Sequence, residues 1–157
     1  MKHSSCVRRM LGTMLGAAVL AGSVTLPAFA ALSGDAASVD ADTAKMKGQA
    51  RATPAAGYTV SEIQLPSGTV VREYISSEGK VFAVTWHGPT MPNLQQMLGT
   101  YFEEFKASAA ATRGNHHHVT VQQSDLVVNS GGHMRSWSGK AYVPALLPPN
   151  FSPDEIT

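Results

Sequence analysis

Apolar and polar side chains alternate along three consecutive stretches in the first half of the chain. These stretches are Tyr58–Leu65, Thr69–Ile75 and Lys80–His87, and the turn sequences Pro66–Gly68 and Ser76–Gly79 separate them. A period of two places alternate side chains on the same face of a strand. Short loops between strands favour antiparallel pairing. The pattern therefore predicts a three-stranded antiparallel meander.

The alternation is most regular in the third stretch, where it places Phe82, Val84 and Trp86 on one face. In the first stretch the apolar positions change parity halfway along. A β-bulge near Ser61-Glu62 would reconcile the two halves. The turns between the three stretches are short, so each joins two strands that are neighbours in the sheet.

A different period begins after the third strand. Apolar residues recur at intervals of three or four positions in one continuous stripe, which consists of Leu94, Met97, Leu98, Tyr101, Phe102 and Phe105. This spacing is typical of one face of an amphipathic helix. Asn93 is a suitable N-cap, and Gln96 stands three residues later, as in a capping box. We expect one long helix that ends before Gly114.

The second half of the chain predicts further strands around a glycine-rich turn. Val119–Val121 and Leu126–Val128 are strand-like, Asn129–Gly132 reads as a turn, and Met134–Val143 alternates again. Near the start, the segment from about Asp40 to Gln49 predicts a short, marginal helix with a thin apolar face. The fold class expected is α+β: an antiparallel sheet of about five strands packed against one long amphipathic helix.

The first thirty residues have the layout of a secretory signal peptide. A basic start with Lys2, Arg8 and Arg9 precedes an uncharged apolar run, and Ala28-Phe29-Ala30 supplies small residues at a cleavage site. An uncleaved membrane anchor is the alternative, but the apolar run is short and diluted by Gly and Thr. The general secretory route and the twin-arginine route both stay open. Either route predicts a periplasmic or secreted protein with no membrane span after cleavage.

Composition narrows the classes of function. The 157-residue chain has 12 Lys+Arg against 11 Asp+Glu and a single cysteine. Removing the leader takes three of the 12 basic residues and Cys6, so the mature chain carries nine basic and 11 acidic residues. Thiol chemistry is then excluded. The absence of a basic cluster argues against nucleic-acid binding.

These features divide the chain into four parts. Residues 1–30 form the leader, and residues 31–57 form an Ala-rich polar segment with the short helix. Residues 58–143 form the α+β core domain. Residues 144–157 form a Pro-rich tail that we expect to lack regular structure, because proline removes backbone donors and fixes φ.

Three consecutive histidines, His116, His117 and His118, are the most unusual local feature. Neutral imidazole is a good ligand for zinc, copper or nickel. A selective site needs three or four ligands in fixed geometry, and no further ligand spacing accompanies the triplet. We expect at most weak, adventitious metal binding in a solvated loop, and no cofactor.

A second group of candidate binding residues lies at predicted strand ends. His87 precedes Gly88-Pro89, and His133 follows a Gly-Gly pair and shares parity with Arg135 and Trp137. Function often gathers where strands meet loops. The alternative is that both histidines are ordinary strand-end residues whose nitrogens bond to backbone or water.

No catalytic constellation is visible in the sequence. The carboxylates are dispersed, and no G-x-S-x-G elbow or phosphate-binding loop occurs. An enzyme whose site assembles from distant residues stays open, with His87, His133 and Asp125 as its candidates.

Three segments resemble an exported bacterial family, the domain of unknown function 2844 family. They are SGTVVREYISSEGKVFAVTWHGPTMPNLQQMLGTYFEEF (Ser67–Phe105), LVVNSGGHMRSWSGKAYVPALLP (Leu126–Pro148) and the opening ALSGDAASVDAD from residue 31. The resemblance covers nearly all of the mature chain and implies a proteobacterial cell-envelope setting. It implies no activity, cofactor or catalytic residue, and the triple histidine is not a feature of that family.

The leading hypothesis is therefore a non-enzymatic binding or structural protein of the bacterial cell envelope, with an envelope protein or component as its partner. The alternatives are the enzyme with a dispersed site and the weak metal-binding protein. Whether His87 and His133 converge with an acid in one pocket distinguishes the first alternative from the others.

Overall fold

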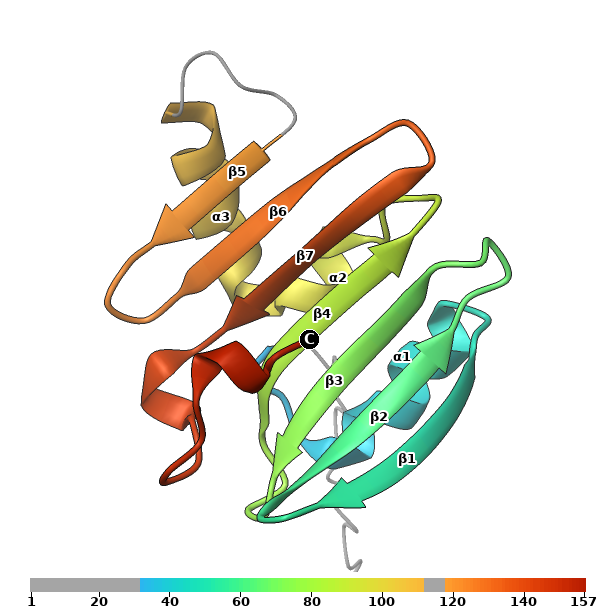
Figure 1. The fold of residues 1–157 in the computed structure, drawn as a ribbon, viewed down its shortest axis with the longest axis vertical. Coiled ribbons are helices and arrows are strands. Elements are labelled where there is room, and N and C mark those ends of the chain that lie inside the picture. Colours follow the sequence, from blue (N-terminus) through green and yellow to red (C-terminus); the bar gives the residue numbers. More distant parts are fainter. Residues whose placement is uncertain (1–31, 112–117) are drawn as a thin grey trace, which may run out of the picture.

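A computed structural model describes residues 32–111 and 118–157 of the chain. Its centre is an antiparallel sheet in the order β1-β2-β3-β4-β7-β6-β5 (Figure 1). The strands are β1 (Gln49–Ala55), β2 (Tyr58–Gln64), β3 (Val70–Ser76), β4 (Val81–Gly88), β5 (His118–Gln122), β6 (Val127–His133) and β7 (Ser136–Tyr142). The predicted leader lies outside the described residues, as do His116 and His117.

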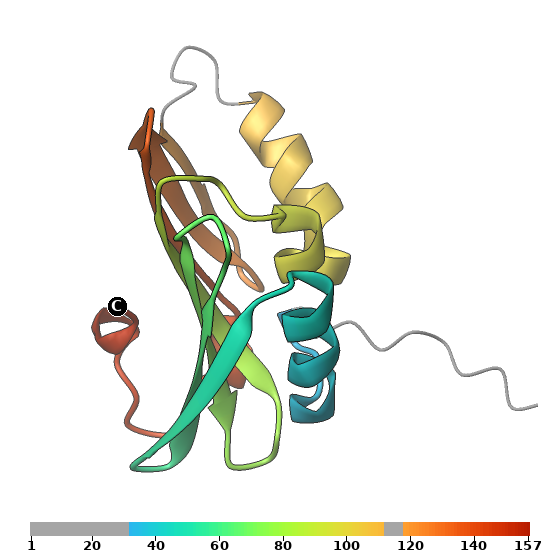
Figure 2. The ribbon, with the colours of Figure 1, turned by 90° about the vertical axis from the view of Figure 1, so that its right-hand side faces the viewer.

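The helices gather on one face of this sheet (Figure 2). They are α1 (Val39–Lys45), preceded by the 3-10 turn η1 (Ala36–Ser38), α2 (Leu94–Leu98), η2 (Gly99–Tyr101) and α3 (Phe102–Ala111). Two more 3-10 turns, η3 (Pro144–Leu146) and η4 (Pro153–Glu155), lie in the C-terminal segment on the opposite face. None of the helices described is long and apolar enough to cross a membrane.

The chain is α+β with an antiparallel sheet, but the prediction of about five strands against one long helix is wrong. The sheet has seven strands. The unpredicted strand is β1, whose seven side chains are all exposed, so that burial imposes no alternating pattern on it. The predicted turn Asn129–Gly132 is also wrong, because these residues belong to β6 and pair with β7.

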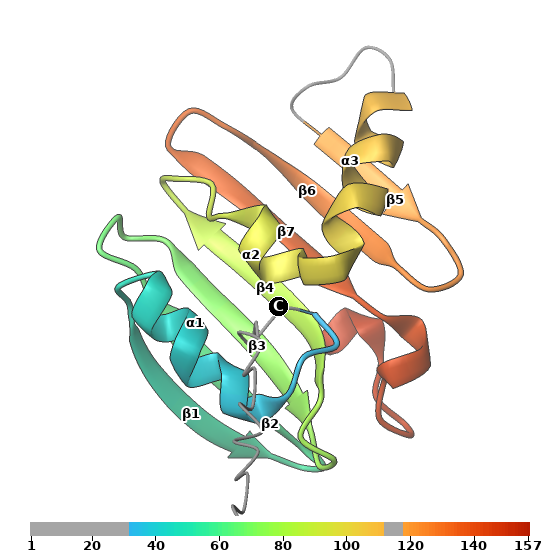
Figure 3. The ribbon, with the colours of Figure 1, turned by 180° about the vertical axis from the view of Figure 1, so that it is seen from behind.

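The long helix is broken at Gly99. The apolar stripe continues through α2 and α3, but Gly99 has φ +53° and ends α2, so that the two helices run in different directions (Figure 3). Glycine adopts this backbone conformation without the steric penalty that other residues meet. The predicted cap is present, since the Asn93 side chain accepts a hydrogen bond from the Gln96 amide.

Around β2 to β4 the sheet is covered on both faces, which explains the phase change along β2. On the helix side, Ile63 joins the main core beneath the helices. On the other side, Tyr58 and Val60 pack against a smaller core formed with the C-terminal segment. Strand β2 pairs with β1 and β3 without a register shift, so the bulge predicted near Ser61-Glu62 is wrong.

An irregularity does occur one strand further on. The pairing of β3 with β4 shifts between Tyr74 and Ile75, which are opposite Ala83 and Val81 respectively. Phe82 is therefore the extra residue, and it belongs to the smaller core, whereas Val84 and Trp86 belong to the main core. The expectation that all three aromatic and branched residues share a face is thus wrong for Phe82, because a bulge reverses parity.

The C-terminal segment, which we expected to lack regular structure, contributes to this smaller core. Ile156 is buried, and the Phe151 ring lies 5.0 Å from that of Phe82 and 5.1 Å from that of Tyr58, edge to face in both cases. Such geometry is favourable for aromatic rings. The segment packs over Phe82 and Tyr142 at one end of β4 and β7, and leaves the other end of these strands, with β6 and β5, uncovered (Figure 1).

Candidate functional site

The uncovered part of the sheet contains a hollow of about 680 Å³, which we call the polar hollow. Two cross-strand rows of side chains form its floor. One row runs from Arg72 through Thr85, Lys140 and Asn129 to Thr120, and the other from Val70 through His87, Ser138 and Gly131 to His118. Adjacent strands lie about 4.8 Å apart, so each row spans about 19 Å.

His118 reaches into the polar hollow because its cross-strand neighbour is glycine. A β-carbon built on Gly131 would lie 2.2 Å from His118 Nδ1 and 2.6 Å from Cε1. The imidazole therefore lies across strand β6 and occupies the space that a side chain at position 131 would fill. This arrangement brings the ring towards Ser138, which is directly opposite Gly131 on β7.

The end of the C-terminal segment forms one wall of the polar hollow. The main-chain oxygen of Thr157 accepts hydrogen bonds from the Tyr74 hydroxyl at 2.8 Å, Arg72 Nη1 at 3.1 Å and Thr85 Oγ1 at 3.3 Å. Lys140 Nζ donates to the main-chain oxygen of Pro153 at 3.1 Å. These contacts fix two cationic side chains at the rim where the segment meets the open face.

The charged side chains of the lining are basic. Arg72, Lys140, His87 and His118 line the polar hollow, and none of the described residues that line it is Asp or Glu. Glu62, just outside, pairs with Arg72 Nε at 2.9 Å. Hydroxyl and amide groups of Thr85, Thr120, Asn129 and Ser138 complete the surface. Such a surface suits an anionic ligand that also carries hydroxyl groups.

Of the sequence-predicted binding residues, His87 lines the polar hollow and the others do not. His133 and Arg135 are exposed at the β6–β7 turn, where His133 pairs with Ser136. Trp137 is half-buried and opposite Gly88. Their binding role stays a prediction.

The residues of the dispersed enzyme hypothesis are kept apart. Asp125 precedes strand β6 and His133 ends it, so the full strand, about 20 Å long, lies between them. His87 is two strands away from β6. Among the described residues, no three or more His, Cys, Asp or Glu side chains gather as a metal site. Of the histidine triplet, only His118 is described.

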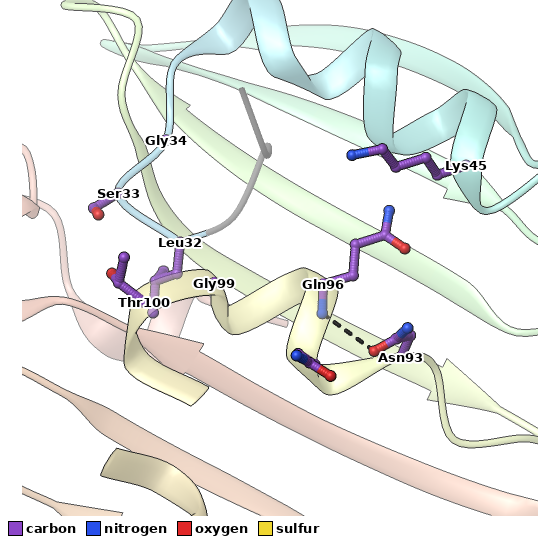
Figure 4. A pocket seen from close by; sticks show the side chains of 9 residues that line it. Leu32, Ser33, Gly34, Lys45, Asn93, Gln96, Gly99 and Thr100 are labelled. Atoms are coloured by element: carbon purple, nitrogen blue, oxygen red, sulfur yellow. Dashed lines mark hydrogen bonds between the residues drawn. The ribbon is translucent and has the colours of Figure 1, made fainter. Parts of the chain in front are cut away.

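A second hollow, of about 620 Å³, lies in the helix layer between α1 and α2, and we call it the helix groove. Leu32, Lys45, Asn93, Gln96 and Thr100 are among the residues that line it (Figure 4). The Gln96 side chain points toward α1 in this view. Its Nε2 donates to Asp42 Oδ1 at 2.9 Å, so that a hydrogen bond joins the two helices at the Gln96 wall of the groove.

Behind this wall lies a buried carboxyl group that the sequence did not single out. Glu73 on β3 is fully buried, and no described residue forms a hydrogen bond with either of its carboxyl oxygens. Burial, together with the charge of the nearby Asp42, raises the pKa of Glu73 from 4.5 to about 8. Glu73 is therefore predominantly protonated at neutral pH.

Comparison with known proteins gives a family without an assigned activity. The family model described as a protein of unknown function, DUF2844, matches residues 28–156. No curated protein and no solved structure matches the chain at a significant level.

Proposed function

Since the chain belongs to the DUF2844 family of proteins of unknown function, we propose, from its own geometry, that it is an exported, non-enzymatic protein of the bacterial cell envelope that binds an anionic envelope component in the polar hollow. The component carries carboxylate or phosphate groups together with hydroxyl groups, as acidic saccharides do.

Export is supported by the sequence of residues 1–30. Its basic start and apolar middle are those of a secretory signal peptide, and Ala28-Phe29-Ala30 supplies the small residues that a signal peptidase recognises. Mass spectrometry of the protein recovered from cells tests this part: we expect Ala31 as the first residue. Intact protein that begins at Met1 in the cytoplasm would contradict it.

The observation that carries the binding proposal is that the charged side chains of the polar hollow are basic. Arg72, Lys140 and two imidazoles line it, and the described lining residues include no Asp or Glu side chain. The Thr157 main-chain oxygen, which accepts from Arg72, is at the wall. An anion placed there replaces water with charge-assisted hydrogen bonds. The hydroxyl and amide groups between the cations match sugar hydroxyls, which both donate and accept.

The polar hollow also contains the residue pair that best supports the alternative, an enzyme. His87 is directly opposite Ser138, at the cross-strand distance of about 5 Å that a base and a nucleophile can bridge after small movements. No acidic residue among the described lining orients His87, and this favours binding over catalysis. A serine-directed fluorophosphonate distinguishes the two, because covalent labelling of Ser138 would favour the enzyme.

Calorimetric titration of the full chain tests the binding proposal. The probes are a galacturonic acid oligomer for carboxylates, inorganic phosphate for phosphates, and maltohexaose as the neutral control. We expect saturable binding of an acidic probe that weakens as salt is added, because exposed charges are screened. Equal binding of maltohexaose, or no binding of either acidic probe, would contradict the proposal.

Two variants place the ligand in the polar hollow. Gly131→Ala forces the His118 ring away from its position, and His87→Gln removes the second imidazole without touching β6. We expect each to weaken binding of the acidic probe about tenfold, the usual worth of one charge-assisted hydrogen bond. His133→Gln, at the exposed turn, is the matched control and should bind as the unchanged protein does. Unchanged binding by both hollow variants would place the ligand elsewhere.

A further inference from the structure

The buried Glu73 side chain has an environment that favours its uncharged form. The side chains opposite it on the neighbouring strands are Ser61 of β2 and Val84 of β4, and neither carries a charge. From the helix layer, α1 contributes Asp42, whose own side chain is 1% exposed. Two carboxyl groups thus share a space from which water is excluded, and only one of them can be ionised at low cost.

The helix that supplies Asp42 is short, and it follows a segment that is bonded to β4 through Ser33 and Gly34. Helix α1 has seven residues, of which Val39 and Asp42 are buried. A helix of this length depends on its tertiary contacts to remain folded. Its link to α2 is the pair of hydrogen bonds from Gln96 Nε2 to the carboxylate and the main-chain oxygen of Asp42, at 2.9 and 3.4 Å. The same Gln96 lines the helix groove.

From this arrangement we propose that the uncharged form of the buried Glu73 carboxyl keeps α1 docked on the sheet, and that its ionisation releases α1 and opens the helix groove. The elements around Glu73 are β2, β4 and α1, and Gln96 of α2 bonds to Asp42 rather than to Glu73 itself. Of the side chains that face Glu73, Ser61 and Val84 are uncharged and Asp42 is the ionisable one. Lys45, three residues along α1 from Asp42, lines the helix groove.

Ionisation of Glu73 places a second negative charge beside Asp42. The repulsion is relieved when either carboxylate reaches water, and α1 is the element that can move, because β3 is held between β2 and β4. Movement of α1 breaks the bonds between Gln96 and Asp42 and separates the two walls of the groove. The expected midpoint lies near pH 8, where Glu73 loses its proton. The inference is independent of ligand binding in the polar hollow, which lies on the other face.

The distance between spin labels on α1 and α3 tests the proposal. Labels are attached at Ala44→Cys and Lys106→Cys, both exposed, in the full chain with Cys6→Ser, and double electron–electron resonance is measured from pH 6 to pH 9.5. We expect the population at the docked distance to be lost as the pH passes about 8. Glu73→Gln should hold the docked distance throughout, whereas Glu78→Gln, an exposed control, should retain the transition.

A second variant keeps the test decisive if Glu73→Gln does not fold. Asp42→Asn preserves an acceptor for Gln96 but removes the neighbouring charge, so the docked distance should persist to higher pH. An unchanged distance distribution across the range in the parent protein would overturn the proposal. So would a transition in Glu73→Gln that matches the parent.

Discussion

At position 73 a carboxyl group occupies a place where an apolar side chain would normally pack, and this makes the stability of the protein depend on pH. The folded chain holds the Glu73 proton up to about pH 8, whereas the unfolded chain releases it near 4.5. The folded state therefore binds more protons between these values. The contribution of the Glu73 proton to the free energy of unfolding is complete below about pH 4.5. It is lost as the pH rises to about 8, by up to about 1.4 kcal/mol per pH unit.

We expect Glu73→Gln to remove this slope, because the amide has no proton to lose in the range. Urea unfolding at pH 5, 6.5 and 8 measures the free energy of unfolding of each variant. The exposed Glu78→Gln should keep the slope of the parent protein. Parallel pH profiles for the parent and Glu73→Gln would show that another group is responsible.

The position of a functional residue could be predicted from the sequence only where the pattern of its own strand indicated it. His87 ends the third alternating stretch, so its place at the edge of a site could be expected. His118 attracted attention as a metal ligand, but its position over Gly131 depends on the pairing of β5 with β6, which no local pattern indicates. The proximity of Asp42 to Glu73 depends on where α1 crosses the sheet, and that is a long-range property.

At the level of elements, the conformation of Gly99 decides that one apolar stripe becomes two helices. Its φ of +53° is in the region that disfavours residues with a β-carbon. We expect Gly99→Ala to destabilise the protein by about 1–3 kcal/mol, the usual cost of such backbone strain. Urea unfolding measures the loss, with the exposed neighbour Thr100→Ala as the control, expected within about 0.5 kcal/mol of the parent. A Gly99→Ala variant as stable as the control would mean that the helix runs straight through this position.

The elements whose existence the sequence predicted correctly are those that bury apolar side chains. The meander β2–β4 and the apolar stripe of α2 and α3 have recognisable periods because burial selects their apolar positions. Strand β1, with its sequence Gln-Ala-Arg-Ala-Thr-Pro-Ala, buries no side chain and so has no such pattern. The glycines of β6 read as a turn, yet the strand keeps them because His118 and the β7 backbone approach too closely for larger residues.

At the scale of the whole molecule, local sequence patterns do not indicate that the second face of the sheet is partly covered. The phase change in β2 and the bulge at Phe82 both follow from a strand that is buried on different faces along its length. The cover comes from residues 144–157, whose prolines predict irregular structure when taken alone. The same segment ends at Thr157 in the wall of the polar hollow, so that it contributes to the fold and to the candidate site together.

This double role gives a prediction centred on Phe151. Its ring contacts those of Tyr58, Tyr74 and Phe82, at centroid distances of 5.1, 6.5 and 5.0 Å. Because the side chain is half-buried, we expect Phe151→Ala to lower the free energy of unfolding by about 2–4 kcal/mol, somewhat less than for a fully buried ring. Urea unfolding measures this loss, and the exposed Asp154→Asn in the same segment serves as the control. Loss of the anchor should also loosen the wall at Thr157 and weaken binding of an acidic probe. A variant with parent-like stability would show that the segment rests on the sheet without holding it, and the smaller core would then lose its assigned role.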